Sequence, residues 1–497
     1  MSAPLQPGEE VFHPAYGRGR VVRLIRGGRY LLVLFEGRRV LSQISAHEVA
    51  GPFRPTLAPA RAPKKGWAAR PEPPPPPRIS VEALLPRGIP GEHQAMQVLE
   101  ALRVGVAPRH MVELYTVGRE REMALVDSDL DQVPEGGAAR VFLGDYGAGK
   151  THMLECIEER ALRRNMLVAR VTLDGGEVAA SHPRRVYRAL IQNLVYPDRI
   201  DRPGLEPLLE AACEKNLDRW LRRGSPRHHH YLSPALAYFR ELRDPQKDRP
   251  LREPLLDWLE GHPTVSNTEL DPALRQATGL RGQRLYALQD HRTLAHLYAY
   301  LLGGISVLAR DLGYAGLAVL FDEAEFYSLL SGQGREFANL LFGYYAAAAL
   351  GPEKVAFDVH SAARGGHLIH RTFPPIFDPV QGIYCVFAMT EDPVGLKALE
   401  AILGQEHFTR LTPLSLAHFQ ELCRRVLELY RRTYPAFTAA DQVERPMGEV
   451  VYQGVERGVF ENPRQVLKFV VELLDYSRLC RDGIPEYVRE LRGHLTA

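Results

Sequence analysis

Cysteine is scarce in this sequence, and its few copies form no recognisable pattern. Among the 497 residues there are only five cysteines, none in a Cys-x-x-Cys pair, namely Cys156, Cys213, Cys385, Cys423 and Cys480. An odd number of scattered cysteines argues against a disulfide framework and against a structural zinc site. We therefore expect the protein to work in a reducing compartment.

Long hydrophobic runs are also missing. The longest candidates, such as residues 344–350, fall well short of the roughly 18 apolar residues that suggest a membrane-spanning helix. The first residues carry Glu9 and Glu10 and lack the apolar stretch of a secretion signal. These absences predict a soluble, cytoplasmic protein that does not contact a membrane.

A strong excess of charge of one sign is absent as well. The 62 basic and 60 acidic residues leave a formal net charge of +2, so composition alone does not indicate a nucleic-acid-binding protein. Most of the basic residues are arginines, which suit phosphate and carboxylate groups, although a GC-rich genome explains that bias equally well. The length predicts two to four domains with ordinary globular cores.

The first segment with a clear pattern is a β-rich unit at residues 1–53. Its short β-prone runs alternate with glycine-rich turns, which predicts a small closed barrel of four or five strands. The pattern Gly-x-x-Val-x-His-Pro-x-x-Gly-x-Gly-x-Val from Gly8 to Val21 resembles Tudor-like barrels, found in CarD-type RNA-polymerase-binding domains and at the ends of UvrD-type helicases. The resemblance implies that the barrel docks a protein partner or nucleic acid.

Seven arginines give this unit a basic character: Arg18, Arg20, Arg23, Arg26, Arg29, Arg38 and Arg39. They are compatible with phosphate contacts, and a solvated rim around a protein-docking barrel explains them equally well.

Residues 54–78 then form a stretch rich in proline, alanine and arginine that includes five successive prolines. Such a stretch predicts an extended linker without a packed core.

Residues 79–405 are predicted to form an α/β core with a helical insertion at about 183–300. Apolar runs at 139–143, 167–173, 316–321 and 383–389 predict strands that alternate with helices. This alternation favours a parallel sheet with helices on both faces. Residues 406–497 contain no convincing strand and are predicted to form a C-terminal helical bundle.

A complete P-loop motif lies between the first of these strands and the helix that follows it. It reads Gly144, Asp145, Tyr146, Gly147, Ala148, Gly149, Lys150 and Thr151, and we also count His152 among the nucleotide-binding residues. In this motif backbone N–H groups surround the phosphates at a helix N-terminus. Lys150 is expected to reach the β- and γ-phosphates of ATP, and the Thr151 hydroxyl to bind Mg²⁺.

The acidic residues that a hydrolytic P-loop protein requires follow the strand at 316–321. Asp322 is expected to hold Mg²⁺ through water, and Glu323 to activate the attacking water as general base. The alternative is that the two acids only cap the next helix. Glu325 adds a third carboxylate for which the sequence suggests no role.

Three further residues fit the same scheme and resemble positions of AAA+ and STAND ATPases. Thr390, after the last strand, resembles the sensor-1 residue, and Arg464 in Asn462-Pro-Arg resembles the sensor-2 arginine. A strand-end cap and a solvated helix start are the respective alternatives. Arg119 belongs to a Gly-Arg-Glu-x-Glu box that, in this class, lies beside the adenine.

Four boxes in order resemble the ATP-binding proteins of BREX phage-defence systems, over about residues 93–480. The boxes begin at Glu100, Thr116, Gly144 and Leu320. The resemblance implies an ATPase that works on DNA with other defence proteins, often beside a helicase-like partner. The N-terminal barrel and linker depart from the family pattern and leave open a related defence, repair or mobile-element system.

Two minor features remain open. Arg364 and Arg371 occupy positions where the arginine fingers of ATPase rings often lie, which leaves homo-oligomerisation as a further hypothesis. The three consecutive histidines at 228–230 invite a metal-site interpretation, but neighbouring side chains in one loop rarely all face one ion.

The sequence therefore predicts an AAA+-like P-loop ATPase that binds ATP and Mg²⁺ and acts with DNA and partner proteins. The alternative is a STAND-like nucleotide switch, or an ATP-dependent scaffold that recruits a helicase or RNA polymerase and has little turnover of its own.

Overall fold

The computed structural model describes most of the chain after residue 89 and four strands before it. The described ranges are 10–13, 17–25, 30–35, 42–45, 90–106, 112–215, 217–362, 364–366, 368–438 and 440–480, with the single positions 486 and 489. The chain divides into two compact units, Met1–Leu84 and Leu85–Ala497. The proline-rich stretch at 54–78 lies outside the described residues.

The first unit contains a four-stranded antiparallel sheet in the order β1-β2-β3-β4. Its strands are β1 (Glu10–His13), β2 (Gly17–Ile25), β3 (Tyr30–Phe35) and β4 (Ser42–Ser45). Closure of this sheet into a Tudor-like barrel remains a prediction. Among the seven arginines noted above, Arg18 and Arg20 are exposed, whereas positions 26, 29, 38 and 39 lie outside the described residues.

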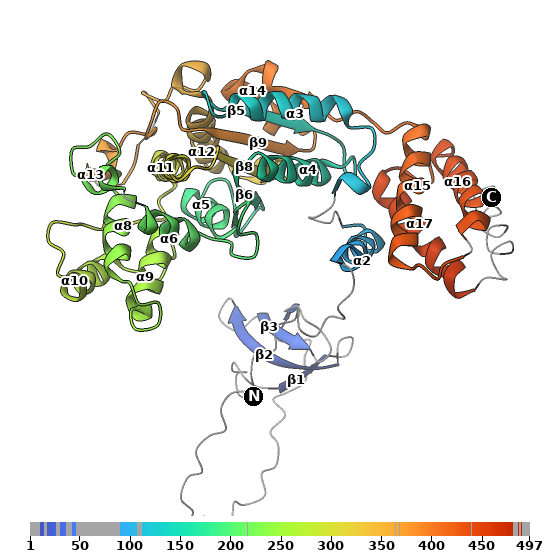
Figure 1. Ribbon diagram of the computed structural model, residues 1–497, viewed down its shortest axis with the longest axis horizontal. Helices are drawn as coiled ribbons and strands as arrows, with labels where there is room; N and C mark the ends of the chain where they lie inside the picture. Colours follow the sequence, from blue (N-terminus) through green and yellow to red (C-terminus); the bar gives the residue numbers. More distant parts are fainter. Residues whose placement is uncertain are drawn as a thin grey trace, which may run out of the picture. The chain divides into compact units, whose positions relative to one another are not determined.

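A six-stranded sheet organises the second unit, in the order β10-β5-β9-β8-β6-β7. Its strands are β5 (Ala138–Leu143), β6 (Leu167–Thr172), β7 (Leu194–Val195), β8 (Leu317–Asp322), β9 (Ile383–Met389) and β10 (Phe408–Arg410). Figure 1 shows β9 between β5 and β8, so three strands that are far apart in the sequence are neighbours in the sheet.

Five of these strands are parallel, as the alternating pattern predicted, and two details correct the expectation. β7 pairs antiparallel with β6, so the sheet is mixed. The expectation that no strand follows residue 405 is wrong, because β10 pairs with β5 in parallel. Both strands are too short to leave a hydrophobic run in the sequence, which is why periodicity does not detect them.

Both faces of the sheet are covered, and the strands divide their side chains between two cores. Along β8, Leu317, Val319 and Phe321 join one hydrophobic cluster, whereas Ala318 and Leu320 join the other. This alternation follows from the two-residue period of a strand. An entirely buried strand of this kind has helices on both sides, which is the arrangement of an α/β fold.

The helices of the first half are α2 (Pro90–Arg103), α3 (Glu120–Gln132), α4 (Lys150–Arg163), α5 (Pro183–Gln192), α6 (Glu206–Glu214), α7 (Asp218–Leu221), α8 (Leu232–Glu241), α9 (Arg249–Leu259) and α10 (Asn267–Thr278). Those of the second half are α11 (Ala295–Leu312), α12 (Gly332–Leu350), α13 (Leu368–Thr372), α14 (Pro393–Leu403), α15 (Leu416–Thr433), α16 (Ala440–Glu456) and α17 (Pro463–Leu479). Short 3₁₀ turns join them, among them η2 (Val112–Leu114) and η4 (Ala324–Leu329).

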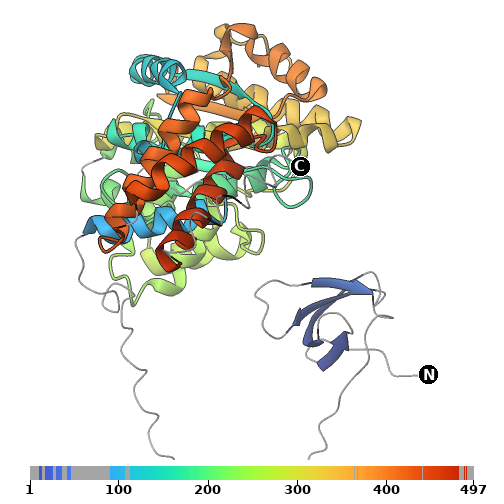
Figure 2. The same ribbon diagram turned by 90° about the vertical axis from the view of Figure 1, so that its right-hand side faces the viewer.

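The last helices pack together with α2, which comes from the beginning of the unit. α15 contacts α16 and α17, and α2 contacts both α15 and α17. Figure 2 shows α2 beside the red C-terminal helices. Arg103 of α2 pairs with Asp475 of α17 at 2.8 Å, which fixes this contact. The helices after residue 415 are therefore tied to the segment that leads into the P-loop.

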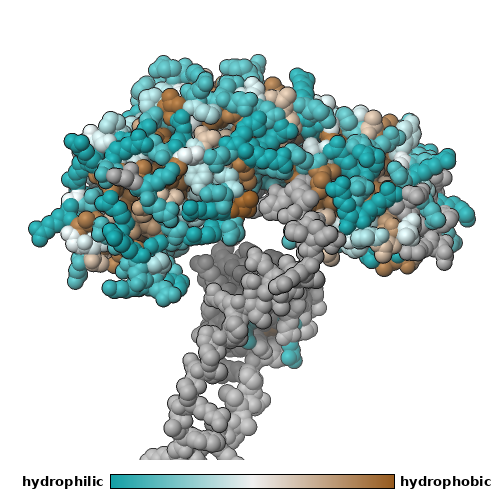
Figure 3. Space-filling model, in the orientation of Figure 1, coloured by the Kyte–Doolittle hydropathy of each residue, from teal (hydrophilic) through white to brown (hydrophobic). Residues whose placement is uncertain are grey.

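The surface of the second unit is mostly hydrophilic in the view of Figure 3, with hydrophobic residues in scattered patches. Within the described part of the chain, no helix is both long and apolar enough to span a bilayer.

Candidate nucleotide-binding site

The loop between β5 and α4 holds the P-loop motif in a conformation that requires glycine. Gly147 and Gly149 have φ angles of 80° and 96°, in the left-handed region that other residues avoid. A Cβ on Gly147 would lie only 2.6 Å from the side chain of Asn462, the N-cap of α17. The loop is thus tightly turned and closely approached by a second helix N-terminus, which suits a phosphate site.

Lys150 is buried at the start of α4 and is linked to the end of β9. Its ammonium group donates hydrogen bonds to the carbonyl oxygens of Gly144 at 3.0 Å and Asp145 at 3.2 Å, and to Oγ1 of Thr390 at 2.9 Å. Thr390 in turn donates to Oε1 of Glu325 at 2.5 Å. Because β9 lies between β5 and β8, residues from three segments meet at one point.

The acidic residues at the end of β8 are held in a defined arrangement. Glu323 has a φ of 59°, an uncommon backbone conformation for a residue other than glycine and one that occurs at functional sites. Asp322 is buried, and its Oδ2 accepts a hydrogen bond from Nη2 of Arg170 at 2.8 Å. Its Oδ1 accepts one from the backbone N–H of Glu323 at 3.1 Å.

Arg170 is the main site residue that sequence analysis missed. It lies on β6 and also pairs with Glu155 of α4 at 2.5 Å, so one guanidinium joins the P-loop helix to Asp322. Burial alone would lower the pKa of Arg170, but the two carboxylates outweigh it and the pKa is raised. The sequence did contain a signal, because Arg170 stands inside an otherwise apolar strand. A buried charged side chain is stable only when it is paired.

The carboxyl group of Glu323 has a raised pKa. Partial burial is the largest cause, followed by the negative charges of Glu325 and Asp322, while Lys150 and Arg464 act in the opposite direction. A carboxylate whose pKa is moved toward neutrality is a better general base than an ordinary exposed glutamate. The general-base role of Glu323 remains a prediction, and Glu325 is one of the charges that raise the pKa of this carboxyl.

Replacing Glu325 with glutamine is expected to move the acid limb of the pH profile of kcat/KM for ATP hydrolysis to lower pH. The substitution removes a negative charge beside Glu323, which lowers the pKa of that carboxyl, and the base must be ionised to work. Glutamine retains an oxygen that can accept the hydrogen bond from Thr390. The matched variant Glu391→Gln, which removes a carboxylate paired with Arg410, should leave the limb in place. An unmoved limb in Glu325→Gln would contradict the coupling.

A cleft of about 870 Å³, open to solvent, runs from the P-loop to the C-terminal helices. One end is formed by the P-loop backbone from Tyr146 to Thr151, together with Glu323 and Arg464. The other end is mainly apolar, and its walls are Leu102, Val106, Tyr115, Val117, Leu414, Leu422 and Leu467. A polar end beside an apolar end matches the triphosphate and the base of a nucleotide.

Tyr146 and Arg464 meet at the mouth of this cleft. Nη1 of Arg464 donates to the hydroxyl of Tyr146 at 3.0 Å, and its guanidinium lies 5.4 Å from the centre of the ring. The side chain of Tyr146 is 74% exposed, whereas tyrosine side chains in folded proteins are usually at least partly buried. The first turn of α17 therefore touches the P-loop directly, where a sensor-2 arginine is expected to lie.

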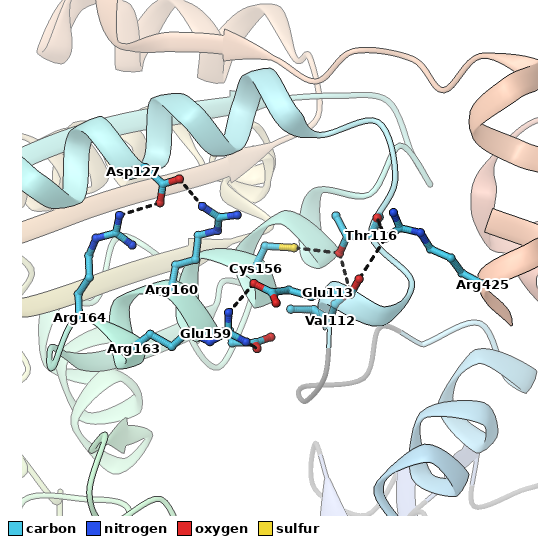
Figure 4. A network of polar contacts seen from close by, with 10 residues as sticks. All are labelled: Val112, Glu113, Thr116, Asp127, Cys156, Glu159, Arg160, Arg163, Arg164 and Arg425. Carbon is cyan, nitrogen blue, oxygen red and sulfur yellow. Dashed lines mark hydrogen bonds and ion pairs between the residues drawn. The ribbon is translucent and has the colours of Figure 1, made fainter. Parts of the chain in front are cut away.

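The segment before α3 forms a wall of the apolar end and is clamped from two sides (Figure 4). Nη1 of Arg425, on α15, donates to the carbonyl oxygen of Thr116 at 2.5 Å and of Glu113 at 3.1 Å. From α4, Arg163 pairs with Glu113 at 2.5 Å. Sequence analysis did not single out Arg425, because its partners are backbone atoms some 300 positions away.

His152 packs against the same segment and is neutral. Burial and the charge of Arg119 lower its pKa to about 4. The hydroxyl of Thr116 donates to the carbonyl of Val112 at 2.6 Å, so its oxygen accepts the proton on Nε2 of His152 at 2.9 Å. His152 lines the cleft beside Tyr115, whose ring centre is 4.9 Å away.

Arg119 is placed to hold the P-loop. It is buried, and its Nη2 donates to the carbonyl oxygen of Ala148 at 2.7 Å while Nη1 donates to that of Thr412, in the connection to α15. Glu122 accepts a hydrogen bond from the backbone N–H of Thr412 at 2.7 Å. The Gly-Arg-Glu-x-Glu box therefore links the P-loop to the connection before α15, and contact of Arg119 with the adenine remains a prediction.

The remaining candidates lie elsewhere. Arg364 donates to the carbonyl of Val359 at 3.3 Å, and Arg371 is exposed on α13; a role as arginine fingers stays a prediction. His229 is buried and stacked on Tyr300, with ring centres 4.1 Å apart, and burial lowers its pKa to about 3. In the part of the chain that the structure describes, no group of three metal-ligating side chains exists.

Residues 91–228 match the family model described as BREX system ATP-binding protein BrxC/D. The chain is similar to an ATP-binding family. The match to the BREX ATP-binding family runs from α2 through the P-loop into the insertion at about 183–300, and ends at residue 228, before Asp322. No curated protein and no solved structure matches the chain.

Proposed function

We propose that this chain binds ATP with Mg²⁺ in the cleft between the P-loop and α17 and hydrolyses it. The observation that carries the proposal is the convergence of Lys150, Thr390, Glu325 and Glu323 at the ends of neighbouring strands. A cation, a hydroxyl and a base brought together in this way would suit the hydrolysis of a γ-phosphate bound at the P-loop. The family match supports ATP as the nucleotide.

The donor groups fit both ligands. Backbone N–H groups of a glycine-rich loop at a helix N-terminus bind phosphate, and the apolar end of the cleft suits a base. Mg²⁺ prefers oxygen ligands and keeps several waters, so Thr151 would bind it directly and Asp322, already bonded to Arg170, through water. When bound, the ion would neutralise charge developing on the phosphates.

In this scheme each residue has a defined task. Lys150 leaves the carbonyl oxygens of Gly144 and Asp145 for the phosphates, since an ammonium group binds phosphate more strongly than neutral oxygens. Glu323 takes a proton from the attacking water. Thr390, held by Glu325, orients that water, and Arg464 contacts the phosphates from α17.

We place this ATPase with DNA and partner proteins in a BREX-like phage-defence or DNA-processing system, on the strength of the family match.

One observation favours a second candidate function, that of a nucleotide switch with little turnover. The carboxylate of Asp322 is occupied by Arg170 and by the backbone of Glu323, so Mg²⁺ binding has to share it.

Replacing Lys150 with alanine is expected to abolish ATP binding, because the phosphates lose the only cation that the P-loop itself provides. Binding would be measured with a fluorescent ATP analogue on the full chain. Lys468→Ala removes a lysine from α17 outside the P-loop and serves as the charge-matched control. Equal affinities for the two variants would exclude the P-loop as the nucleotide site.

Turnover by the wild-type chain decides between the two candidates. ATP hydrolysis would be measured with and without double-stranded and single-stranded DNA. Turnover that DNA stimulates supports the ATPase acting with DNA. Tight binding of ATP with negligible turnover under all three conditions supports the nucleotide switch instead.

A further inference from the structure

Two segments of the helical insertion contain no acidic residue. The chain has 60 aspartates and glutamates among 497 residues, or about one in eight, yet none lies at 219–240 or at 272–289. The same segments contain eight arginines, namely Arg219, Arg222, Arg223, Arg227, Arg240, Arg275, Arg281 and Arg284. A local excess of this size contrasts with the nearly neutral chain as a whole.

The fold brings the two segments together. The ring of Tyr231 in the first lies 6.0 Å from that of Tyr286 in the second, and Phe373 packs against both at 5.6 Å. The carbonyl of Tyr286 also accepts a hydrogen bond from the indole of Trp258 at 3.0 Å. These aromatic contacts hold together the backbones that carry the arginines, in the part of Figure 1 that contains α8, α9 and α10.

At the surface, an arginine of the first segment lies on a turn of the second. The guanidinium of Arg223 is 3.6 to 3.9 Å from the point where a Cβ of Gly282 would be. Gly282 has a φ of 86°, and the turn that it forms stands between Arg281 and Arg284 in the sequence. Arg284 in turn lies over the ring of Tyr286, 5.3 Å from its centre. At least three cationic side chains are thus gathered on one small surface.

Half of the eight arginines are neutralised and half are not. Arg219, Arg227, Arg240 and Arg275 form ion pairs with Asp311, Asp378, Glu241 and Asp271. The other four, Arg222, Arg223, Arg281 and Arg284, are exposed and form no ion pair or hydrogen bond with any residue that the structure describes. We call these four the arginine patch. The pKa of His228 is lowered, first by its burial and then by the positive charge of Arg223.

Clustered like charges repel one another, and an anionic ligand that neutralises them relieves this repulsion. A protein partner would require an apolar centre to its interface, but none of the exposed large hydrophobic side chains among the described residues lies in either segment. Single-stranded nucleic acid would require exposed aromatic rings for base stacking, whereas Trp220, Tyr231 and Tyr238 are buried and Tyr286 is half-buried beneath Arg284. Guanidinium groups without such additions suit the phosphate backbone of a duplex.

We propose that the arginine patch is a docking surface for the phosphate backbone of double-stranded DNA. This proposal rests on the proposed function, which couples the ATPase to DNA, and assigns the DNA contact to the insertion within the ATPase unit. α8, which belongs to the first of the two segments, packs against α11, and α11 leads directly into β8, which ends at Asp322. The patch is thereby connected through α8 and α11 to the strand that ends at the P-loop site.

The test measures binding of a fluorescent DNA duplex to the full chain at several salt concentrations. The triple variant Arg223→Ser, Arg281→Ser, Arg284→Ser is compared with Arg121→Ser, Arg432→Ser, Arg445→Ser, which loses the same charge from α3, α15 and α16. For the patch variant we expect weaker binding and a slope of log Kd against log salt reduced by about two to three, since each phosphate contact contributes roughly 0.9. The control should keep the wild-type slope.

Equal affinities and slopes in the two triple variants would overturn the proposal, and so would absence of duplex binding by the wild-type chain. Patch-dependent binding that is tighter for single-stranded DNA or for polyglutamate would also overturn it, in favour of that ligand. ATP turnover without DNA is measured in parallel and should be unchanged in the patch variant. If the wild-type chain hydrolyses no ATP but shows patch-dependent duplex binding, the ATPase proposal fails while the docking surface stands.

Discussion

Replacing Glu323 with glutamine is expected to slow ATP turnover by about two to four orders of magnitude and to leave ATP binding intact. General-base catalysis contributes roughly this factor, and glutamine cannot accept the proton. Glu323 lies in the cleft beside Lys150, and its raised pKa suits it to the task. The backbone at this position, with φ of 59°, directs the side chain from a strained turn between β8 and η4.

The measurement combines single-turnover hydrolysis with ATP affinity. Because Glu323 and glutamine are nearly the same size, a loss of turnover without a loss of affinity separates chemistry from folding. Glu391→Gln, two residues after β9, is the matched control and should retain turnover. Turnover in Glu323→Gln within a few-fold of wild type would identify another base, and Glu325 would be the first to examine because it is bonded to Thr390.

The sequence was sufficient for those parts of the site that depend on local pattern. The P-loop is one continuous motif, and its strand and helix have strong periodicity, so Lys150 and the following helix α4 could be placed from the sequence. Asp322 and Thr390 could be placed because Asp322 ends one fully buried strand and Thr390 follows another. In parallel sheets the carboxyl ends of the strands lie on one edge, which is where ligands bind.

Interactions between distant segments could not be predicted in the same way. Arg170 and Asp322 are separated by 152 positions and Arg425 and Thr116 by 309, and no periodicity encodes such pairs. β10 is three residues long and belongs to the sheet only because β5 offers a free edge. The arginine patch likewise arises from two segments that only the aromatic contacts of Tyr231 and Tyr286 bring together.

Replacing Arg170 with methionine is expected to destabilise the second unit by about 3–5 kcal/mol. Removing one partner of a buried ion pair leaves the remaining charges uncompensated, and such losses are of this size. The side chains of Arg170, Glu155 and Asp322 are 13%, 3% and 5% exposed, so water cannot replace the lost cation. Methionine has a similar length and fills the space, which restricts the effect to the charge.

Chemical denaturation of the full chain would measure this loss of free energy. Arg164→Met is the matched control, because Arg164 also binds two carboxylates, Asp127 and Asp131, but near the surface, where the loss should not exceed about 1 kcal/mol. Adding Glu155→Gln to Arg170→Met should restore part of the stability, since one buried charge is then removed. Equal losses for Arg164→Met and Arg170→Met would show that Arg170 is dispensable, and the link between α4 and Asp322 would have to depend on packing alone.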